Sequence, residues 1–504
     1  MAGIGFSLKR LFHKKGFFAL CRAYGYAGII CCGPMVLGVT LLAGMSFVAR
    51  LGGLSAHDRE LMNVMLTYSL LASLVATSWL NMVVTRYVSD MLYSGQAGRV
   101  MPSFYGSCTI LLLLGGLPYG VFLCFSGVAF VYKVLCLWYT AVLIVVWVEM
   151  VYLTALKDYR GILLAFVISL MAGFLLALIL VALGRASVAS LAGCVILCYG
   201  LLMVWYYRLL IGFFPQNEGS RFSFLRWLDR YRALAFNGLF VNIGLYGHLV
   251  LMYFGPLHVR VEGLFYSAPL HDVPALMAFF SILITTVNFV TAVEVRFYPK
   301  YRDYYSLFND HGAIRDIMQA EDEMLTVLEQ ELTVNAQKQL ITTILFIVFG
   351  RLVMRHTALG LNDLSLGIFM ILCVGYGLYA IGNSNMLVLL YFEDYAGALW
   401  GTAAFAGVSV AATVWQLGFG SAKYYGLGFT LGALAFYLII WLRLEWYTRQ
   451  LPYFLLCRQQ LTAGAERGAF AALCNWLEAR EAAYPPETPD KEEPLREKPE
   501  TEKA

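Results

Sequence analysis

The stretch Gly212–Arg232 reads GFFPQNEGSRFSFLRWLDRYR and lies near the middle of a very apolar chain. It carries four arginines, Arg221, Arg226, Arg230 and Arg232. Six long apolar runs precede it and six follow it. A cluster of arginines beside a membrane span is retained on the cytoplasmic side, because its translocation is unfavourable. The stretch therefore predicts a cytoplasmic joint between two halves of six spans each.

The composition supports a protein that spans a membrane many times. Of the 504 residues 60% are hydrophobic and only 13% are charged, and the mean hydropathy is +0.69. Soluble domains are about 45–50% apolar and about 25% charged, so the excess apolar surface is expected to face lipid. We predict an all-α polytopic membrane protein with about twelve transmembrane helices in two six-helix lobes. The net charge of +4 gives no basis for nucleic-acid binding.

Twelve apolar runs are candidates for the spans, each of which needs about 20 apolar residues. They are Ala23–Val48, Leu61–Val88, Phe104–Phe130, Val134–Ala155, Ile162–Leu183, Val188–Ile211, Ala233–Phe254, Pro274–Val295, Gln339–Met354, Leu364–Phe392, Ala396–Gly418 and Tyr424–Trp446. The ninth is short, and Asn383-Ser384-Asn385 interrupts the tenth, so we expect the tenth to be broken or tilted. Lysine and arginine gather in the segments that this arrangement places inside, which predicts that both termini are cytoplasmic.

The runs divide the chain into successive segments. These are a basic amphipathic N-terminus (1–22), an N-lobe (23–211), the joint (212–232), a C-lobe (233–446), an amphipathic cytoplasmic segment (447–480) and a proline-rich charged tail (481–504). A signal peptide at the N-terminus is disfavoured, because the apolar run that follows is too long and no small-residue cleavage site follows it. The composition of the tail predicts disorder.

The longest inner connection, 296–338, belongs to the C-lobe half and is acidic. Its apolar residues recur at helical spacing, at Ile314, Ile317, Met324, Leu325, Leu328 and Leu332. One interpretation is an amphipathic helix that rests on the protein's own inner face. The other is a docking helix for a cytoplasmic partner, since a connection of this length is usually functional or disordered.

Polar and ionisable residues inside the spans are candidates for a substrate path, because they are costly in lipid. They are Asn81, Arg86, Glu149, Asn237, Asn242, His248, Asn288 and Glu294. Arg86 and Asp90 are one helical turn apart, a spacing that also suits a structural ion pair. The Glu149 carboxyl either couples to a proton or cation or is satisfied by a neighbouring helix. The amides and hydroxyls of spans seven and eight either line a cavity or join helices.

No motif indicates catalysis or a cofactor. The chain lacks the GxxxxGK[ST] pattern of a phosphate-binding loop, so no ATP site is expected. Its cysteines lie mainly in apolar runs and have no zinc spacing. We therefore predict a transporter without catalytic residues, metal or cofactor.

The opening MAGIGFSLKRLF, with its basic run and Gly33-Pro34 in the first span, resembles the Pel exopolysaccharide transporter family, PelG. That family belongs to the multidrug/oligosaccharidyl-lipid/polysaccharide (MOP) flippase superfamily. The resemblance implies a V-shaped pair of lobes around a central cavity in the bacterial inner membrane. It also implies export of a cationic amino-sugar polymer of the biofilm matrix. The implied partners are a cytoplasmic glycosyltransferase and a membrane-bound cyclic-di-GMP receptor.

Two other functions remain open at this point. An ion-coupled multidrug or cation antiporter of the same fold would need an essential buried carboxylate, for which Glu149 is the best candidate. A membrane glycosyltransferase or acyltransferase would use His57-Asp58-Arg59-Glu60 in the first outer loop and His248 in span seven.

Overall fold

A computed structural model describes residues 17–154, 159–309, 312–356, 362–457 and 468–483. Most of the basic N-terminus and most of the tail predicted above lie outside these residues. The first half of the chain forms the N-lobe. Its helices are α2 (Phe17–Leu51), α3 (Ala56–Tyr93), α4 (Val100–Phe125), α5 (Phe130–Leu153), α6 (Tyr159–Ala182) and α7 (Val188–Phe213), with a short 3-10 turn at Ala97–Arg99.

The second half forms the C-lobe. Its elements are α9 (Arg232–Met252), the strands β1 (Val259–Glu262) and β2 (Phe265–Ser267), α10 (Pro269–Phe279), η2 (Phe280–Ile282), α11 (Leu283–Ala292), η3 (Val293–Phe297), α12 (Tyr298–Asn309), α13 (Ile314–His356), α14 (Asp363–Tyr391), α15 (Tyr395–Phe419), η4 (Ala422–Tyr424) and α16 (Leu427–Thr448). The strands pair as an antiparallel hairpin. The joint holds α8 (Leu225–Arg230), and α17 (Leu451–Cys457) and α18 (Ala469–Ala483) follow α16.

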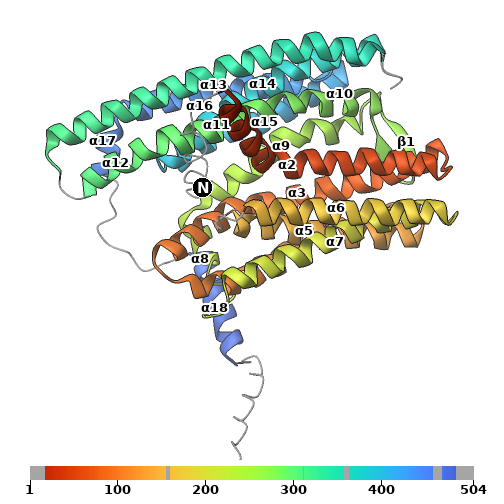
Figure 1. The fold of residues 1–504 in the computed structure, drawn as a ribbon, viewed down its shortest axis with the longest axis horizontal. Coiled ribbons are helices and arrows are strands. Elements are labelled where there is room, and N and C mark those ends of the chain that lie inside the picture. The colour runs from red at the N-terminus through yellow and green to blue at the C-terminus, as the bar shows by residue number, and fades with distance from the viewer. Residues whose placement is uncertain (1–16, 155–158, 310–311, 357–361, 458–467, 484–504) are drawn as a thin grey trace, which may run out of the picture.

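The prediction of an all-α membrane protein is confirmed. Among the described residues, eleven helical segments are long and apolar enough to cross a bilayer, and α2 contains a shorter apolar helix, Val36–Leu51. With α2 they account for the twelve predicted spans. Figure 1 shows the C-lobe helices α13 and α14 in the upper layer and the N-lobe helices α5, α6 and α7 in the lower layer. The hairpin lies at one end of the molecule, and α8 and α18 lie at the other.

We call these ends the hairpin face and the joint face. The hairpin face carries β1–β2, the turn between α4 and α5, and the start of α3. The joint face carries residues 214–231, the turn between α14 and α15, and α18.

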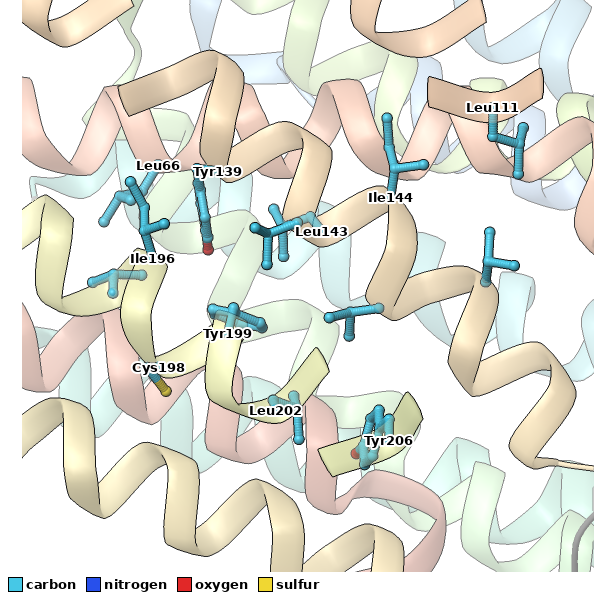
Figure 2. Packing of buried hydrophobic residues seen from close by; sticks show 14 of the residues in the cluster. Leu66, Leu111, Tyr139, Leu143, Ile144, Ile196, Cys198, Tyr199, Leu202 and Tyr206 are labelled. Atoms are coloured by element: carbon cyan, nitrogen blue, oxygen red, sulfur yellow. The ribbon is translucent and has the colours of Figure 1, made fainter. Parts of the chain in front are cut away.

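The N-lobe core is built from tightly packed helices. Leu143 and Ile144 on α5 are wholly buried, and Tyr139 on α5 packs edge-on against Tyr199 on α7 with ring centroids 5.6 Å apart (Figure 2). Within lipid the hydrophobic effect does not drive helices together, so close packing must hold the lobe. Gly115 on α4 lies so near α3 that an added Cβ would sit 2.5 Å from the Cβ of Ala76.

The region 296–338 differs from the connection that the sequence suggested. It is helical in its described part, because α12 continues from α10, α11 and η3, and α13 is one helix of 43 residues. Thus α13 contains both the acidic segment with its apolar stripe and the short ninth run. The ninth run is therefore part of a helix that is long enough to cross a membrane. The tenth span was expected to be broken or tilted. It is not broken, because α14 runs without interruption through Asn383–Asn385. Ser384 accounts for part of this continuity, because its hydroxyl donates to the Ala380 carbonyl of its own helix at 2.9 Å.

Candidate functional site

The two lobes are closed against each other at the hairpin face. The Leu264 N–H of the hairpin donates to the Ser126 carbonyl at 2.7 Å. The Tyr266 N–H donates to the Tyr68 hydroxyl on α3 at 3.2 Å, and the Ser267 hydroxyl donates to Glu60 at 2.6 Å. Because the hairpin belongs to the C-lobe and its partners belong to the N-lobe, these bonds must break when the lobes separate here.

Aromatic rings complete the hairpin-face closure. Tyr68 stacks on Tyr253 with centroids 5.3 Å apart and meets Phe265 edge-on at 5.0 Å. Gly263 at the hairpin tip has a φ of +58°, and an added Cβ would lie 1.9 Å from the Ser126 carbonyl oxygen. Only glycine fits this position, because it combines a left-handed backbone with a very close approach.

The joint face has a closure of different chemistry. Arg86 on α3 pairs with Glu393 at 2.8 Å, donates to the Tyr395 hydroxyl at 3.0 Å, and pairs with Asp90 of its own helix at 3.0 Å. The Asn237 amide donates to the Tyr395 carbonyl at 3.2 Å. The structure therefore brings two of the predicted path residues, Arg86 and Asn237, together at Tyr395, in a charged contact between the lobes.

Between these closures the lobes touch along two helix pairs. On α9, Gly238 lies against the α3 backbone, where an added Cβ would be 2.2 Å from the Ser78 carbonyl oxygen. Gly28 of α2 meets Val287 of α11 at 3.8 Å by the same measure. The pairs α3–α9 and α2–α11 thus form the seam between the two lobes.

A cavity of about 340 Å³ opens in the C-lobe between the α10–η3 segment and α14. Aromatic rings and a few polar groups line it together. The lining includes Phe279, Phe289, Tyr379, Tyr391, Thr285, Thr286, Asn383, Ser384 and Glu294. A cavity with mainly apolar walls and a few placed polar groups is typical of a small-molecule site.

Glu294 is the predicted path residue that reaches this cavity. Its side chain is 5% exposed. It lies in η3, a π-helical turn, and such turns occur frequently at functional sites.

Asn288 joins helices within the C-lobe. Its amide donates to Asn335 on α13 at 3.0 Å, its carbonyl accepts from Lys338, and Asn335 in turn donates to Ser384 on α14 at 3.1 Å. The Lys338 ammonium on α13 thereby has a hydrogen-bond partner. Asn288 is not among the residues that line the cavity.

The remaining predicted path residues lie apart from the cavity. Glu149 is wholly buried inside the N-lobe, and neither carboxylate oxygen has a hydrogen-bond partner among the described residues. The Asn242 amide donates to the Gly238 carbonyl of its own helix at 3.0 Å. Asn81 is half-buried on α3, where its carbonyl accepts from Thr85. His248 is wholly buried in the C-lobe, next to His271.

The apolar residues of the stripe on α13 fall into two groups, buried and exposed. Met324 and Leu328 are buried in the C-lobe core, and Ile317, Leu325 and Leu332 pack against it. Ile314, in contrast, is 79% exposed.

An ion pair holds this part of α13 to α12. The Lys300 ammonium lies 2.6 Å from Glu323 and donates a hydrogen bond to it, which lowers the pKa of the Glu323 carboxyl below its ordinary value. Both groups are exposed, so this pair fixes register more than it adds stability.

Residues at the start of α3 serve local structure. The Ser55 side chain accepts from the Asp58 N–H at 3.1 Å and so caps α3, and Glu60 bonds Ser267 in the hairpin-face closure.

Sequence reasoning missed the residues that form the closures and the second wall of the cavity. Glu393 and Tyr395 lie in a turn between spans, where no local pattern marks a contact with α3. For Tyr379 and Asn383 a signal did exist, because Asn383-Ser384-Asn385 stands out in an apolar run. We interpreted it as a sign of a broken or tilted helix, whereas Asn383 and Ser384 line the cavity.

The fold is shared with solved transporters. The chain is similar to an inward-facing multidrug resistance MATE family transporter of the MOP superfamily, with a TM-score of 0.57 and 12% identity over 84% of this chain and 99% of that chain. A MATE protein in its bent conformation gives a TM-score of 0.59 and 11% identity, over 88% of this chain and 98% of that one. A MOP superfamily transporter from Pyrococcus furiosus gives 0.55 and 12%, over 89% and 98%. These likenesses show the fold alone.

Sequence comparison supplies the family. No curated protein matches the chain. The family model described as "PelG: Putative exopolysaccharide Exporter (EPS-E)" matches residues 1–455, which is most of the chain. Together with two lobes of the MOP transporter fold, this match shows that the chain belongs to the PelG family of exopolysaccharide exporters.

Proposed function

We propose that this protein moves an exopolysaccharide of the Pel type, an amino-sugar polymer of the biofilm matrix, across the bacterial inner membrane. The observation that supports it best is the PelG match over residues 1–455 on a MOP transporter fold. Two lobes with separate closures at opposite faces suit alternating access, in which one closure opens while the other holds.

The joint face is the cytoplasmic face in this proposal. It carries the arginine cluster of residues 221–232, and such clusters are retained inside. Both termini then lie in the cytoplasm. The polymer would enter from the joint face and leave at the hairpin face.

The C-lobe cavity offers the groups that a sugar chain needs. Sugar rings have apolar faces that suit Phe279 and Tyr379, and polar edges that suit Thr286 and Asn383. The Glu294 carboxylate would pair with the amino group of a cationic sugar through a charge-assisted hydrogen bond.

The driving force in this proposal is elongation of the polymer by a cytoplasmic glycosyltransferase or an ion gradient. The exposed end of α13, with Ile314 79% and Met318 65% exposed, is the surface we assign to that enzyme. A membrane-bound cyclic-di-GMP receptor would regulate the assembly. Deletion of residues 314–332 is too severe a test, because Met324 is part of the core. The double substitution Ile314→Ser/Met318→Ser is milder and should reduce co-purification of the enzyme.

Secretion tests the cavity. Glu294→Gln should lower secreted polymer at least about tenfold in cells that carry no other copy, since one charge-assisted hydrogen bond is worth about 1.5–3 kcal/mol. Tyr379→Ala should also lower it, because it removes an aromatic ring from the cavity wall. Glu445→Gln on α16 is the matched control, because that carboxylate is exposed and pairs with Arg449 of its own helix. Equal secretion by all three variants at equal protein level would refute the role of the cavity.

One observation favours a second candidate, an ion-coupled antiporter of small cations. The buried Glu149 carboxylate, which has no hydrogen-bond partner in the described part of the chain, is the kind of group that binds a proton. Under this alternative Glu149→Gln abolishes proton-driven uptake of small cations by membrane vesicles. Under the exporter proposal the parent protein shows no such uptake.

A further inference from the structure

Two histidines face each other inside the C-lobe. The rings of His248 on α9 and His271 on α10 have centroids 5.5 Å apart, and both side chains are wholly buried. No ring nitrogen of either residue makes a hydrogen bond of good geometry among the described residues, although the Leu245 carbonyl lies within reach of His248. A buried polar group without a partner costs about 1–3 kcal/mol. We therefore expect the burial of these two imidazoles to serve a function.

A carboxylate stands at one end of the pair. Oδ1 of Asp272 lies 3.6 Å from Nδ1 of His271, and its Oδ2 accepts from the Ala268 N–H at 3.2 Å. A proton on His271 would convert this contact into an ion pair with no net charge.

The other titratable groups around the pair are tyrosines. Tyr376 on α14 lies 6.3 Å from His248 between ring centroids, and Tyr253 at the end of α9 interacts with Asp272. On α16 the facing side chain is Phe429, which carries no charge. Within the described residues, no group of three or more His, Cys, Asp or Glu side chains is arranged to hold a metal ion. A proton is therefore the ligand that this site fits.

The site is connected to the hairpin-face closure through one ring. Tyr253, which lies near Asp272, stacks on Tyr68 of the N-lobe at 5.3 Å. Asp272 also accepts a hydrogen bond from the N–H of Ala268, the residue that directly follows strand β2. Any change in the partner of Asp272 therefore acts on both the hairpin and the aromatic stack that hold the lobes together.

We propose that His248, His271 and Asp272 form a proton-binding site that controls the hairpin-face closure. Protonated His271 draws Asp272 away from Ala268 and Tyr253, and the closure loosens. Loss of the proton returns Asp272 and restores the closure. This inference rests on the proposed export function, because it assigns protons as the ions that set the transport cycle.

Spin-label distances test the proposal on the full chain in nanodiscs. Labels on non-canonical residues at Ala56 and Val259, both exposed, report the hairpin-face separation. Between pH 8 and pH 5 the parent should shift from a short to a longer distance. His271→Gln and His248→Gln should abolish the shift, while His57→Gln, which alters an exposed histidine on the same face, should retain it.

The outcomes separate this inference from the export function. A parent distance that does not change with pH overturns the proton site, and so does a full shift in the His248→Gln/His271→Gln double variant. Export that continues normally in either case leaves the export function standing. Because the histidine variants could lose their fold, the isolated parent is also examined by NMR with ¹³C-labelled histidine. Two buried imidazoles that do not titrate between pH 8 and pH 5 would likewise refute the site.

Discussion

The two lobe-to-lobe closures hold the molecule with different forces. At the hairpin face, backbone hydrogen bonds and stacked rings join the lobes, as at Leu264–Ser126 and Tyr68–Tyr253. At the joint face, a part-exposed ion pair between Arg86 and Glu393 does so. Packing of neutral groups does not depend on salt, whereas part-exposed charges are screened. The joint-face closure is therefore expected to be the more sensitive of the two to ionic strength.

The largest effect is expected from Gly263→Ala at the hairpin tip. The left-handed backbone costs about 1–2 kcal/mol for alanine, and overlap of the new methyl group with the Ser126 carbonyl adds about 1–3 kcal/mol. Thermal unfolding and the distance between labels at Ala56 and Val259 measure the result: a lower Tm and an open hairpin.

Gly53→Ala is the matched control for this substitution. Gly53 also has a positive φ, +75°, but an added Cβ would meet nothing within 4 Å. It should share the backbone cost and leave the hairpin in place. Equal hairpin displacement in the two variants would mean that the close approach to Ser126 does not hold the closure.

The second effect concerns the joint face. Arg86→Ala removes the cation that Glu393 and Asp90 share, and a hydrogen bond to a charged group is worth about 1.5–3 kcal/mol. Labels at Tyr93 and Tyr453, both exposed, should move apart, while the hairpin-face distance stays constant. Arg449→Ala is the control, since its pair with Glu445 lies within α16 and its flank. A joint face that stays closed without Arg86 would contradict the comparison.

A change in ionic strength tests the same comparison of the two closures without a mutation. Raising the ionic strength from about 0.1 M to about 1 M shortens the Debye length from about 10 Å to about 3 Å. We expect the joint-face distance in the parent to increase and the hairpin-face distance to remain unchanged. An equal response of both faces would show that charge does not distinguish them.

Features within one helix could be predicted from the sequence, whereas contacts between the lobes could not. Twelve helices and two lobes follow from apolar runs, because lipid forces the backbone to satisfy its hydrogen bonds within each helix. Glu294 was identifiable, since an acid in a span is unusual. Glu393 and Tyr395 were not, because a contact between residues 86 and 393 depends on how two lobes meet. The continuous α13 was missed for a related reason: Asn335 and Lys338 read as polar loop residues until their partners on α11 and α14 are known.

The smallest effect tests whether α18 strengthens the joint face. Helix α17 packs on the C-lobe, where Phe454 stacks on Tyr447 at 4.5 Å. Helix α18 instead binds the joint, through Glu478 to Arg226 at 2.6 Å and Glu481 to Arg221 at 3.2 Å. The C-terminal segment therefore links the two lobes at the face that the charges close. The family match ends at residue 455, so α18 lies beyond it.

Neutralising that link should have a measurable but small result. Surface ion pairs are worth about 0.2–1 kcal/mol each, so Glu478→Gln/Glu481→Gln should speed amide hydrogen exchange in α18 by a fewfold at most. The Ala471 N–H, which donates to Asp229 at 2.7 Å, is the most informative amide. Glu445→Gln, on the C-lobe side, should leave exchange in α18 unchanged. If exchange in the double variant equals the parent's, buried contacts such as that of Cys474, and not these ion pairs, hold α18 on the joint.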